Sequence, residues 1–385
     1  MASHLVRQGH QVSMVCGRYT GGITGLDGAF HNGRREGTVN GINVIEFDIE
    51  YSNSDGFLRR AYLFTKYAVR SVMQALTRKY DVVFATSTPL TAGIPGILSK
   101  WLRGKPFIFE VRDLWPELPR EMGVIRNPVI LGLMSILEWL SYKSADRLIG
   151  LSPGIVDGIA RHGISRDKIT LIPNGCDLHI FQDSRNRWRP DGVGTSDLLA
   201  VFTGAHGIAN GLDAVLDMAA ELNIRGRDDI KIVLIGQGKL KPTLIKRAQR
   251  DSLENVLFLD PVDKVTLAGL LASADIGLQI LANVPAFYFG TSPNKFFDYI
   301  AAGLPVLTNY PGWLADMIRQ HNCGFVVSPD NPGAFADALE TAAYDREALK
   351  MMGRRGRVLA EAKFSRVDLA SQFESWIISS SVRDN

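Results

Sequence analysis

The chain lacks a long hydrophobic run, a secretory signal and a strong net charge. No stretch approaches the ~20 consecutive apolar residues that a membrane-spanning helix needs, since the most apolar segment, residues 128–137, ends at Glu138. Residues 1–7 contain no apolar run of the secretory kind. The net charge of +3 is too small to argue for nucleic acid by itself. We therefore expect a cytoplasmic protein without a nucleic-acid partner.

Cysteine is also scarce. Cys16, Cys176 and Cys323 are odd in number, widely separated and without metal-type spacing, so we expect free thiols in a reducing compartment. No cluster of His, Asp or Glu has the spacing of a metal site. The sequence contains neither a Walker loop nor a nucleophile elbow. Nothing in these patterns predicts a metal or another cofactor.

Length and composition predict two globular domains. The 385 residues are too many for one ordinary core. Short apolar runs alternate with helical patterns, and because these runs are continuous, they indicate parallel strands buried on both faces. This order predicts a doubly wound α/β fold. The expected strands are 11–16, 43–48, 81–85, 106–111, 147–151, 169–172, 199–203, 230–235, 256–259, 275–280, 305–308 and 324–327.

A polar segment separates the two halves. Residues 182–196 contain glycine and proline and fit neither helical nor strand periodicity, which predicts a linker. The first domain then spans residues 1–182 and the second spans residues 197–363. Two similar sheets joined by one linker should face each other across a cleft, with ligands at the carboxyl ends of strands from both sides.

The segment 290–306 contains the most informative pattern. Ser292 can cap a helix and Pro293 suits its first position, while Gly303 is suited to end that helix. A helix start that carries Lys295 can hold a phosphate, and Asp298 projects from the same face. One interpretation is a clamp for a nucleotide diphosphate with a carboxylate for a sugar hydroxyl. The alternative is an ordinary capped helix with a Lys–Asp ion pair.

Polar residues also follow two expected strands of the first half. Asp113, in the segment 112–117, could contact a sugar hydroxyl or act as a base. The alternative is a salt bridge of Arg112 with Asp113 or with Glu117. Thr86, Ser87 and Thr88 end the preceding strand, before Pro89, and could supply hydroxyls to the same crevice.

Two glycine-containing turns follow strands of the second half. Gly204 ends one strand, and Gly236 and Gly238 follow the next. Glycine lets a backbone approach a ligand closely, although a tight strand-to-helix turn explains the same pattern. His206, in the first turn, is more often a structural hydrogen-bonding residue than a catalyst.

Two helical segments of the first half could serve a surface. Residues 58–79 combine Arg59, Lys66 and Arg70 with an apolar side, and residues 129–139 are strongly apolar. A basic amphipathic helix can lie on anionic lipid. The alternative is that both helices cover the sheet of the first domain.

Three segments together resemble retaining glycosyltransferase family 4. They are V-R-D-L-W-P-E at 111–117, I-P-N-G-C-D at 172–177 and P-N-K-F-F-D-Y-I-A-A-G-L-P-V at 293–306. Within this family the chain looks most like bacterial O-antigen, capsule and exopolysaccharide enzymes that transfer N-acetyl-L-fucosamine to a polyprenyl-diphosphate-linked sugar. The resemblance implies a GT-B fold with the acceptor on the first domain and a UDP-sugar on the second. It also implies retention at the anomeric carbon without a metal.

The resemblance further implies roles for individual residues. Asp298 matches the acid that binds the ribose, and Lys295 would neutralise the diphosphate together with the amides of Ser292 to Asn294. Asp113 lies in the segment near the anomeric centre, with Thr86, Ser87, Arg112 and Glu117 around the acceptor. Gly204, Gly236 and Gly238 correspond to the turns at the nucleotide. The last helix, from residue 364 onward, would return to the first domain, and the enzyme would dock on the inner face of the cytoplasmic membrane.

Three features depart from the family pattern. The first acid of the family's acid pair falls at Gly290, and two basic positions fall at Ala205 and Asn210. The diphosphate would then depend more on Lys295, helped by Lys239 or Lys241. Family members open with a strand and a Gly-rich loop before the helix that begins here at Ala2, so we expect either that this sequence starts late or that the first domain is built incompletely. Two alternatives therefore stay open, a UDP-sugar 2-epimerase-like enzyme and a catalytically silent binding or scaffold protein.

Overall fold

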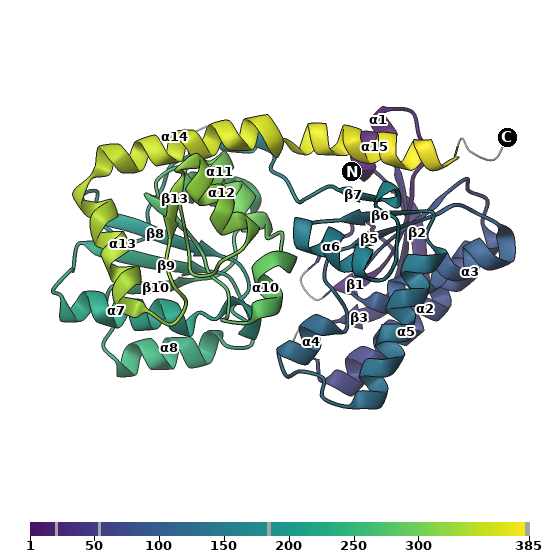
Figure 1. Cartoon of the computed structure of the whole chain (residues 1–385), viewed down its shortest axis with the longest axis horizontal. Coiled ribbons are helices and arrows are strands. Elements are labelled where there is room, and N and C mark those ends of the chain that lie inside the picture. Colours follow the sequence, from purple (N-terminus) through teal and green to yellow (C-terminus); the bar gives the residue numbers. More distant parts are fainter. Residues whose placement is uncertain (20–21, 53–54, 183–185, 382–385) are drawn as a thin grey trace. The chain divides into compact units, whose positions relative to one another are not determined.

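The structure is a computed structural model that describes residues 1–19, 22–52, 55–182 and 186–381. The chain divides into two compact units (Figure 1). Unit 1 comprises Met1–Pro173 together with Val367–Asn385, and unit 2 comprises Asn174–Arg366. Each unit is an α/β structure in which helices pack on parallel strands, as the alternating sequence pattern predicts.

Unit 2 contains a six-stranded sheet in the order β10-β9-β8-β11-β12-β13. All neighbouring strands pair in parallel. The chain runs outward from β8 in one direction and then returns to build β11 to β13 on the other side, so the strand order reverses between β8 and β11. Such a reversal is where open α/β sheets bind ligands. The strands are β8 (Leu198–Thr203), β9 (Ile230–Ile235), β10 (Val256–Leu259), β11 (Ile276–Gln279), β12 (Val306–Thr308) and β13 (Gly324–Val326).

The helices of unit 2 cover this sheet, and apolar side chains of the helices and strands together form the core. Phe202 of β8, Leu216 of α7 and Leu339 of α13 are fully buried in one apolar cluster. The helices are α7 (Asp213–Ile224), α8 (Lys241–Arg250), α9 (Lys264–Leu271), α10 (Pro285–Gly290), α11 (Asn294–Ala301), α12 (Trp313–His321), α13 (Pro332–Tyr344) and α14 (Arg346–Lys363).

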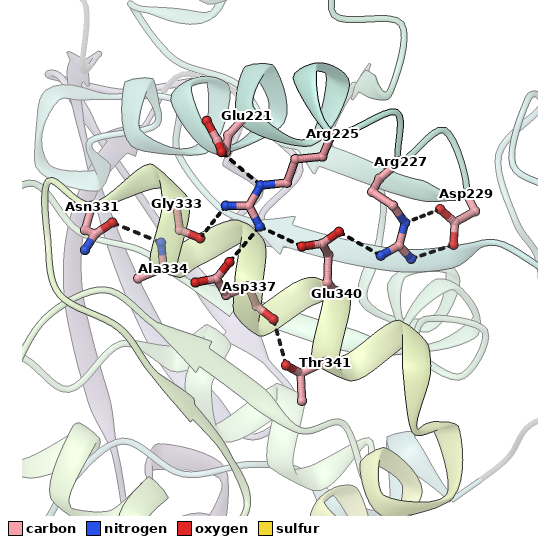
Figure 2. Close-up of polar contacts among 10 residues, drawn as sticks. All are labelled: Glu221, Arg225, Arg227, Asp229, Asn331, Gly333, Ala334, Asp337, Glu340 and Thr341. Carbon is pink, nitrogen blue, oxygen red and sulfur yellow. Dashed lines mark hydrogen bonds and ion pairs between the residues drawn. The ribbon is translucent and has the colours of Figure 1, made fainter.

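An ion-pair network fastens α13 to the end of α7 (Figure 2). Arg225 reaches Glu221 at 2.9 Å and both Asp337 and Glu340 at 2.6 Å, and Arg227 reaches Glu340 at 3.0 Å. Networks of this kind are worth more than isolated surface pairs. We assign the network a structural role, because all of its charges are paired with each other.

The segment 182–196 is not a free linker. Trp188 Nε1 donates a hydrogen bond of 2.8 Å to the carbonyl of Thr266, and Arg189 forms an ion pair of 3.1 Å with Asp275. Residues 183–185 of the predicted linker lie outside the described residues. The predicted boundary near residue 182 is therefore wrong, since unit 2 already begins at Asn174. Polar composition alone did not show that Trp188 and Arg189 find partners in the second unit.

Unit 1 contains two separate sheets. One has the order β1-β3-β2 and the other has the order β4-β5-β6-β7. Among the described strands, β1 (Ser13–Tyr19) pairs only with β3 (Ile42–Tyr51), and β4 (Val83–Thr86) pairs only with β5 (Phe107–Val111). The second sheet is completed by β6 (Arg147–Gly150) and β7 (Ile169–Leu171), all in parallel.

One strand of unit 1 was not predicted. β2 (Arg34–Val39) runs antiparallel to β3, and the two join through Asn40 and Gly41, which both have positive φ. An Asn-Gly pair between two strands is the strongest short hairpin signal. The Asn-Gly pair therefore predicts this hairpin, whereas the pattern of continuous apolar runs does not.

The helices of unit 1 pack on both sheets (Figure 1). They are α1 (Ala2–Arg7), α2 (Phe57–Thr77), α3 (Gly93–Arg103), α4 (Glu117–Glu121), α5 (Pro128–Ser144), α6 (Pro153–Arg161) and α15 (Arg366–Ser381). α3 packs against both α2 and α5. Leu369 and Phe373 of α15 join Ile108 and Ile149 in one apolar cluster, so the last helix packs in unit 1, as the resemblance implied.

Candidate functional site

The carboxyl ends of β8 and β9 form the floor of the predicted donor site in unit 2. A Cβ atom at Gly236 would lie 1.8 Å from the carbonyl oxygen of Gly204, and one at Gly238 would lie 2.5 Å from the carbonyl oxygen of His206. The two turns are therefore in direct contact. Glycine is needed here because the two turns approach each other closely, and the approach of a ligand to these glycines stays a prediction.

The start of α11 differs from the predicted cap. The helix begins at Asn294, and Pro293 is its extended N-cap without a side-chain cap. Ser292 instead accepts a 3.1 Å hydrogen bond at Oγ from the backbone N–H of Asn174. The prediction that Ser292 caps the helix is wrong, because its hydroxyl is bound to Asn174 and Pro293 takes the N-cap position. Gly303, with φ of 72°, follows the end of the helix as predicted.

Lys295 has no acidic partner among the described residues. Its Nζ donates to Asn210 Oδ1 at 2.6 Å and lies 4.1 Å from the centroid of the Phe202 ring. Desolvation lowers the pKa of Lys295 to about 7. The predicted alternative of a Lys295–Asp298 ion pair is wrong. Lys295 thus presents a desolvated cation with a neutral partner at a helix start, which is the chemistry that an anion would complement.

Asp298 pairs with a residue that the sequence analysis did not single out. Its Oδ2 accepts from Lys264 Nζ at 2.6 Å, while its buried Oδ1 has no hydrogen-bond partner in the described part of the chain. Burial raises the pKa of Asp298, although Lys264 opposes this shift. An unpartnered carboxylate oxygen in this position can accept a hydroxyl. Lys264 lies 34 positions earlier in the sequence, and no local pattern connects the two.

Lys241 is fully engaged within the fold. Its ammonium donates to the carbonyls of Gly236 and Leu259 at 3.0 and 2.8 Å and pairs with Asp260 at 2.6 Å. These contacts hold the ends of β9 and β10 together. We therefore correct the prediction that Lys241 contacts the donor and assign it a structural role. Lys239, the other candidate of this turn, is exposed.

His206 lies buried beneath these turns. Neither ring nitrogen has a hydrogen-bond partner among the described residues. Burial, together with the positive charges of Lys241 and Lys295, lowers the pKa of His206 to about 4. The ring is therefore neutral near pH 7, and the structure does not give it the hydrogen bonds that the sequence analysis expected.

In unit 1 the segment 112–117 follows β5. Thr88 Oγ1 donates to Asp113 Oδ2 at 3.0 Å, and burial raises the pKa of this carboxyl. Ser87 is buried, and its Oγ accepts from the backbone N–H of Arg112 at 2.8 Å. Ser87 thus supports the backbone at Arg112, and a contact of its hydroxyl with a ligand stays a prediction. Thr88, which the sequence analysis placed at the same crevice, is the hydroxyl that touches Asp113.

The remaining polar residues of this region find other partners. Arg112 pairs with Glu110 at 3.5 Å and Glu117 pairs with Arg161 at 3.7 Å, so neither predicted Arg112 salt bridge forms. Thr86 Oγ1 donates to Glu110. In the described residues, no group of three or more His, Cys, Asp or Glu side chains is arranged to hold a metal ion.

A cavity of about 370 Å³ lies beside the end of β1, outside the predicted site. Its charged lining residues include Arg18, Arg35 and Glu46. Arg35 pairs with the buried Glu46 at 2.8 Å and Arg18 pairs with Asp48 at 3.2 Å. Because these arginines are already paired with carboxylates, the cavity does not indicate a particular class of ligand.

Comparison with known proteins identifies the families that the two parts of the chain match. Residues 1–175 match the model of a glycosyl transferase 4-like domain, and residues 198–345 match the model of glycosyl transferases group 1. An uncharacterized glycosyltransferase of Methanocaldococcus jannaschii is 23% identical over 355 residues, which cover 90% of this chain and 83% of the relative. The O-antigen chain mannosyltransferase C of Escherichia coli is 25% identical, with 63% of each chain covered. A D-inositol 3-phosphate glycosyltransferase of Catenulispora acidiphila is 29% identical, and the alignment spans 59% of its length.

Solved structures with the same fold share little sequence. Sucrose-phosphate synthase of Thermosynechococcus elongatus aligns with a TM-score of 0.74 at 16% identity, covering 98% of this chain and 91% of that one. Anabaena HepE in complex with UDP aligns with a TM-score of 0.64 at 16% identity, covering 86% and 85% of the two chains. WaaG, a glycosyltransferase involved in lipopolysaccharide biosynthesis, gives 0.66 at 16% identity with 97% and 93% covered. The two Rossmann-like units, each matched by a glycosyltransferase domain model, show that the chain belongs to the GT-B glycosyltransferases that join a 4-like domain to a group 1 domain.

Proposed function

We propose that this glycosyltransferase moves a sugar from a UDP-sugar to a polyprenyl-diphosphate-linked acceptor, with retention and without a metal. The sugar is N-acetyl-L-fucosamine or a related N-acetylated hexose, and the product enters an O-antigen, capsule or exopolysaccharide. The observation that carries the donor part is the environment of Lys295, a desolvated cation at the start of α11 whose one polar partner among the described residues is the neutral Asn210. A diphosphate is the anion that best fits this position.

The chemistry follows from where charge develops. As the bond between the anomeric carbon and the diphosphate oxygen breaks, negative charge grows on the departing UDP. Lys295 and the backbone N–H groups at the start of α11 would stabilise that charge. The acceptor hydroxyl forms the new bond to the anomeric carbon and gives up its proton, for which Asp113 is the candidate base. The unpartnered Oδ1 of Asp298 would accept a ribose hydroxyl.

Two similar proteins support the choice of donor and acceptor. HepE, which shares the fold, binds UDP in its crystal structure. The E. coli relative acts on the O-antigen chain according to its name. The amino-sugar and its attachment to a polyprenyl carrier rest on the sequence resemblance.

The outward face of α5 supports a lipid-linked acceptor. Val129, Leu133, Ile136 and Trp139 recur at helical spacing and are 47 to 68% exposed, while the polar Glu138 of the same helix is buried. A helix that turns its apolar stripe toward solvent reverses the usual pattern of a globular protein. No helix in the described part of the chain is long and apolar enough to cross a membrane. The stripe instead fits the interfacial region of a bilayer.

The outward face of α2 has the same character. Leu58, Tyr62, Val69 and Met73 are 59 to 82% exposed, whereas Leu63, Ala68 and Ala75 face inward. One side of the helix thus packs on the protein, and apolar side chains lie exposed on the other. Covering the sheet and docking on a lipid surface, the two interpretations of this segment, are therefore compatible. α2 contains four basic and no acidic residues, which suits the anionic inner leaflet.

A transfer assay tests the proposal. Purified protein would be given a labelled UDP-N-acetylhexosamine and a polyprenyl-diphosphate sugar in the presence of EDTA, and UDP binding would be followed by calorimetry. Transfer of label to the lipid with retained anomeric configuration supports the proposal. UDP binding without transfer would favour a binding protein, and formation of an epimer without acceptor would favour an epimerase.

A further inference from the structure

Lys264 is the first residue of α9, and two contacts fix its place. Asp263 caps the helix, since its Oδ1 accepts from the backbone N–H groups of Val265 and Thr266 at 2.9 and 3.0 Å. The ammonium of Lys264 lies 5.4 Å from the centroid of the Phe181 ring, within the ~6 Å over which an aromatic face attracts a cation. Lys264 is therefore held both at its backbone and at its charged end.

Asp298, the partner of Lys264, comes from a helix that is itself buried. The neighbouring Phe297 and Tyr299 of α11 are fully buried, so the backbone gives the carboxylate little freedom to move. Its Oδ2 accepts from Lys264 Nζ at 2.6 Å, whereas its buried Oδ1 has no hydrogen-bond partner among the described residues. Nearly all buried polar atoms are hydrogen-bonded, so an exception of this kind needs an explanation.

The other charged and titratable groups within electrostatic reach of Asp298 do not replace Lys264. They are Asp177, Arg366 and the thiol of Cys176. Arg366 Nε pairs with Asp177 at 2.9 Å, and Cys176 Sγ donates to a backbone carbonyl at 3.3 Å. Burial raises the pKa of Asp298, and the hydrogen bond from Lys264 is the largest contribution that opposes this shift. Lys264 is therefore the group that balances the charge of Asp298.

We propose that Lys264 is a positioning residue, which binds one oxygen of Asp298 and thereby aims the other at a ribose hydroxyl of the nucleotide. The inference rests on the proposed function in assigning the ribose to Asp298. An ionised carboxylate accepts a hydroxyl about twice as strongly as a neutral acid does. Without Lys264, the buried carboxylate must either turn toward another donor or take up a proton. In both cases the ribose hydroxyl loses a fixed, charged acceptor.

The first test compares the affinities for UDP, 2′-deoxy-UDP and 3′-deoxy-UDP. In the wild type we expect at least one deoxy analogue to bind about 10- to 100-fold more weakly than UDP, because a hydrogen bond to a charged acceptor is lost. Lys264→Met should lower this ratio at least about fivefold, while the affinity for that analogue changes less than about twofold. Lys264→Arg should restore most of the ratio, since a guanidinium can also pair with the carboxylate.

The control for this comparison is Lys246→Met, at an exposed lysine of α8, which should leave the ratio unchanged. A lysine that merely stabilised the fold would affect all three nucleotides alike, so equal losses in Lys264→Met would overturn the proposal. A ratio near one in a wild-type protein that binds UDP would overturn it as well, because the carboxylate would then bind no ribose hydroxyl.

The second test needs no nucleotide. Denaturant unfolding of Lys264→Met, Asp298→Asn and the double variant would be measured at about pH 6 and about pH 8. Relative to the wild type, Lys264→Met should lose more of its denaturation midpoint at the higher pH, because its native state keeps a proton on the buried Asp298 that the unfolded state has released. In the Asp298→Asn background, Lys264→Met should change the midpoint little at either pH.

The outcomes of the two tests separate the inference from the proposed function. Additive effects of the two substitutions on unfolding would overturn the positioning role. Coupled effects in a protein that does not bind UDP would uphold the positioning of Asp298 by Lys264 and reject only the proposed function. The expected nucleotide ratios in a protein that transfers no sugar would likewise uphold the inference and reject the transfer.

Discussion

The ammonium of Lys295 lies 2.6 Å from Oδ1 of Asn210, a neutral partner for a cation with its pKa lowered to about 7. An amide can orient this cation but cannot neutralise it. The arrangement leaves most of the electrostatic potential of Lys295 available to an anion. This relationship is the basis of the first two predictions.

Replacing Lys295 by alanine should abolish most of the activity but leave the stability nearly unchanged. We expect kcat/KM to fall about 10²- to 10³-fold, as when one preorganised charge at a leaving group is lost. The free energy of unfolding should change by less than about 1 kcal/mol, because the removed cation is desolvated and has no ion pair with any residue that the structure describes. Lys239→Ala is the matched control, since Lys239 is an exposed lysine of the neighbouring turn. Equal losses of activity and stability in Lys295→Ala would make Lys295 merely structural.

UDP binding should take up a proton above neutral pH. Desolvation lowers the pKa of Lys295 in the free protein to about 7, and a bound diphosphate would raise it again. The affinity for UDP should therefore fall as the pH rises from 7 to 9, by up to about tenfold per unit. Calorimetry in two buffers with different ionisation enthalpies measures the uptake directly. In Lys295→Met both the uptake and this pH dependence should disappear, and their persistence would assign the proton elsewhere.

Gly236 should not tolerate a side chain. Its φ is 152°, and a Cβ would lie 1.8 Å from the carbonyl oxygen of Gly204. Gly236→Ala must separate the two turns, and we expect it to lower the free energy of unfolding by about 3 kcal/mol or more. Gly290→Ala is the control, because nothing lies within 4 Å of that position, and it should change stability by less than about 1 kcal/mol. Denaturant unfolding measures both, and a neutral Gly236→Ala would show that the turns have room to separate.

The sequence predicted the architecture better than the side-chain partners. Continuous apolar runs such as 230–235 form strands in the structure. A strand that is buried on both faces is apolar along its whole length, so its own residues are enough to predict it. The helix ended at Gly303 because a local conformation demands glycine there. Both features depend on residues that are close in the sequence.

The partners of charged residues could not be predicted in the same way. Asp298 meets Lys264, Lys295 meets Asn210 and Glu138 meets His162. Each pair is formed by residues on separate elements, and their spacing follows from how the helices pack on the sheet. The family resemblance predicted which residues contact a ligand, but it did not show that Lys241 holds two strand ends or that Ser292 is bound to Asn174.

The last prediction concerns the apolar outward stripe of α5. Leu133 and Ile136 are 63 and 57% exposed, so acidic substitutions there should leave the fold intact. Leu133→Asp combined with Ile136→Asp should weaken binding to vesicles of anionic phospholipid at least tenfold, because it removes buried apolar area and adds repulsion. Transfer to a soluble, short-chain acceptor should remain, whereas transfer to a polyprenyl acceptor in vesicles should fall in parallel with binding. Val358→Asp, at an exposed apolar position of unit 2, is the control. Sedimentation with vesicles measures binding, and wild-type protein that stays in the supernatant would refute the membrane-docking role of this face.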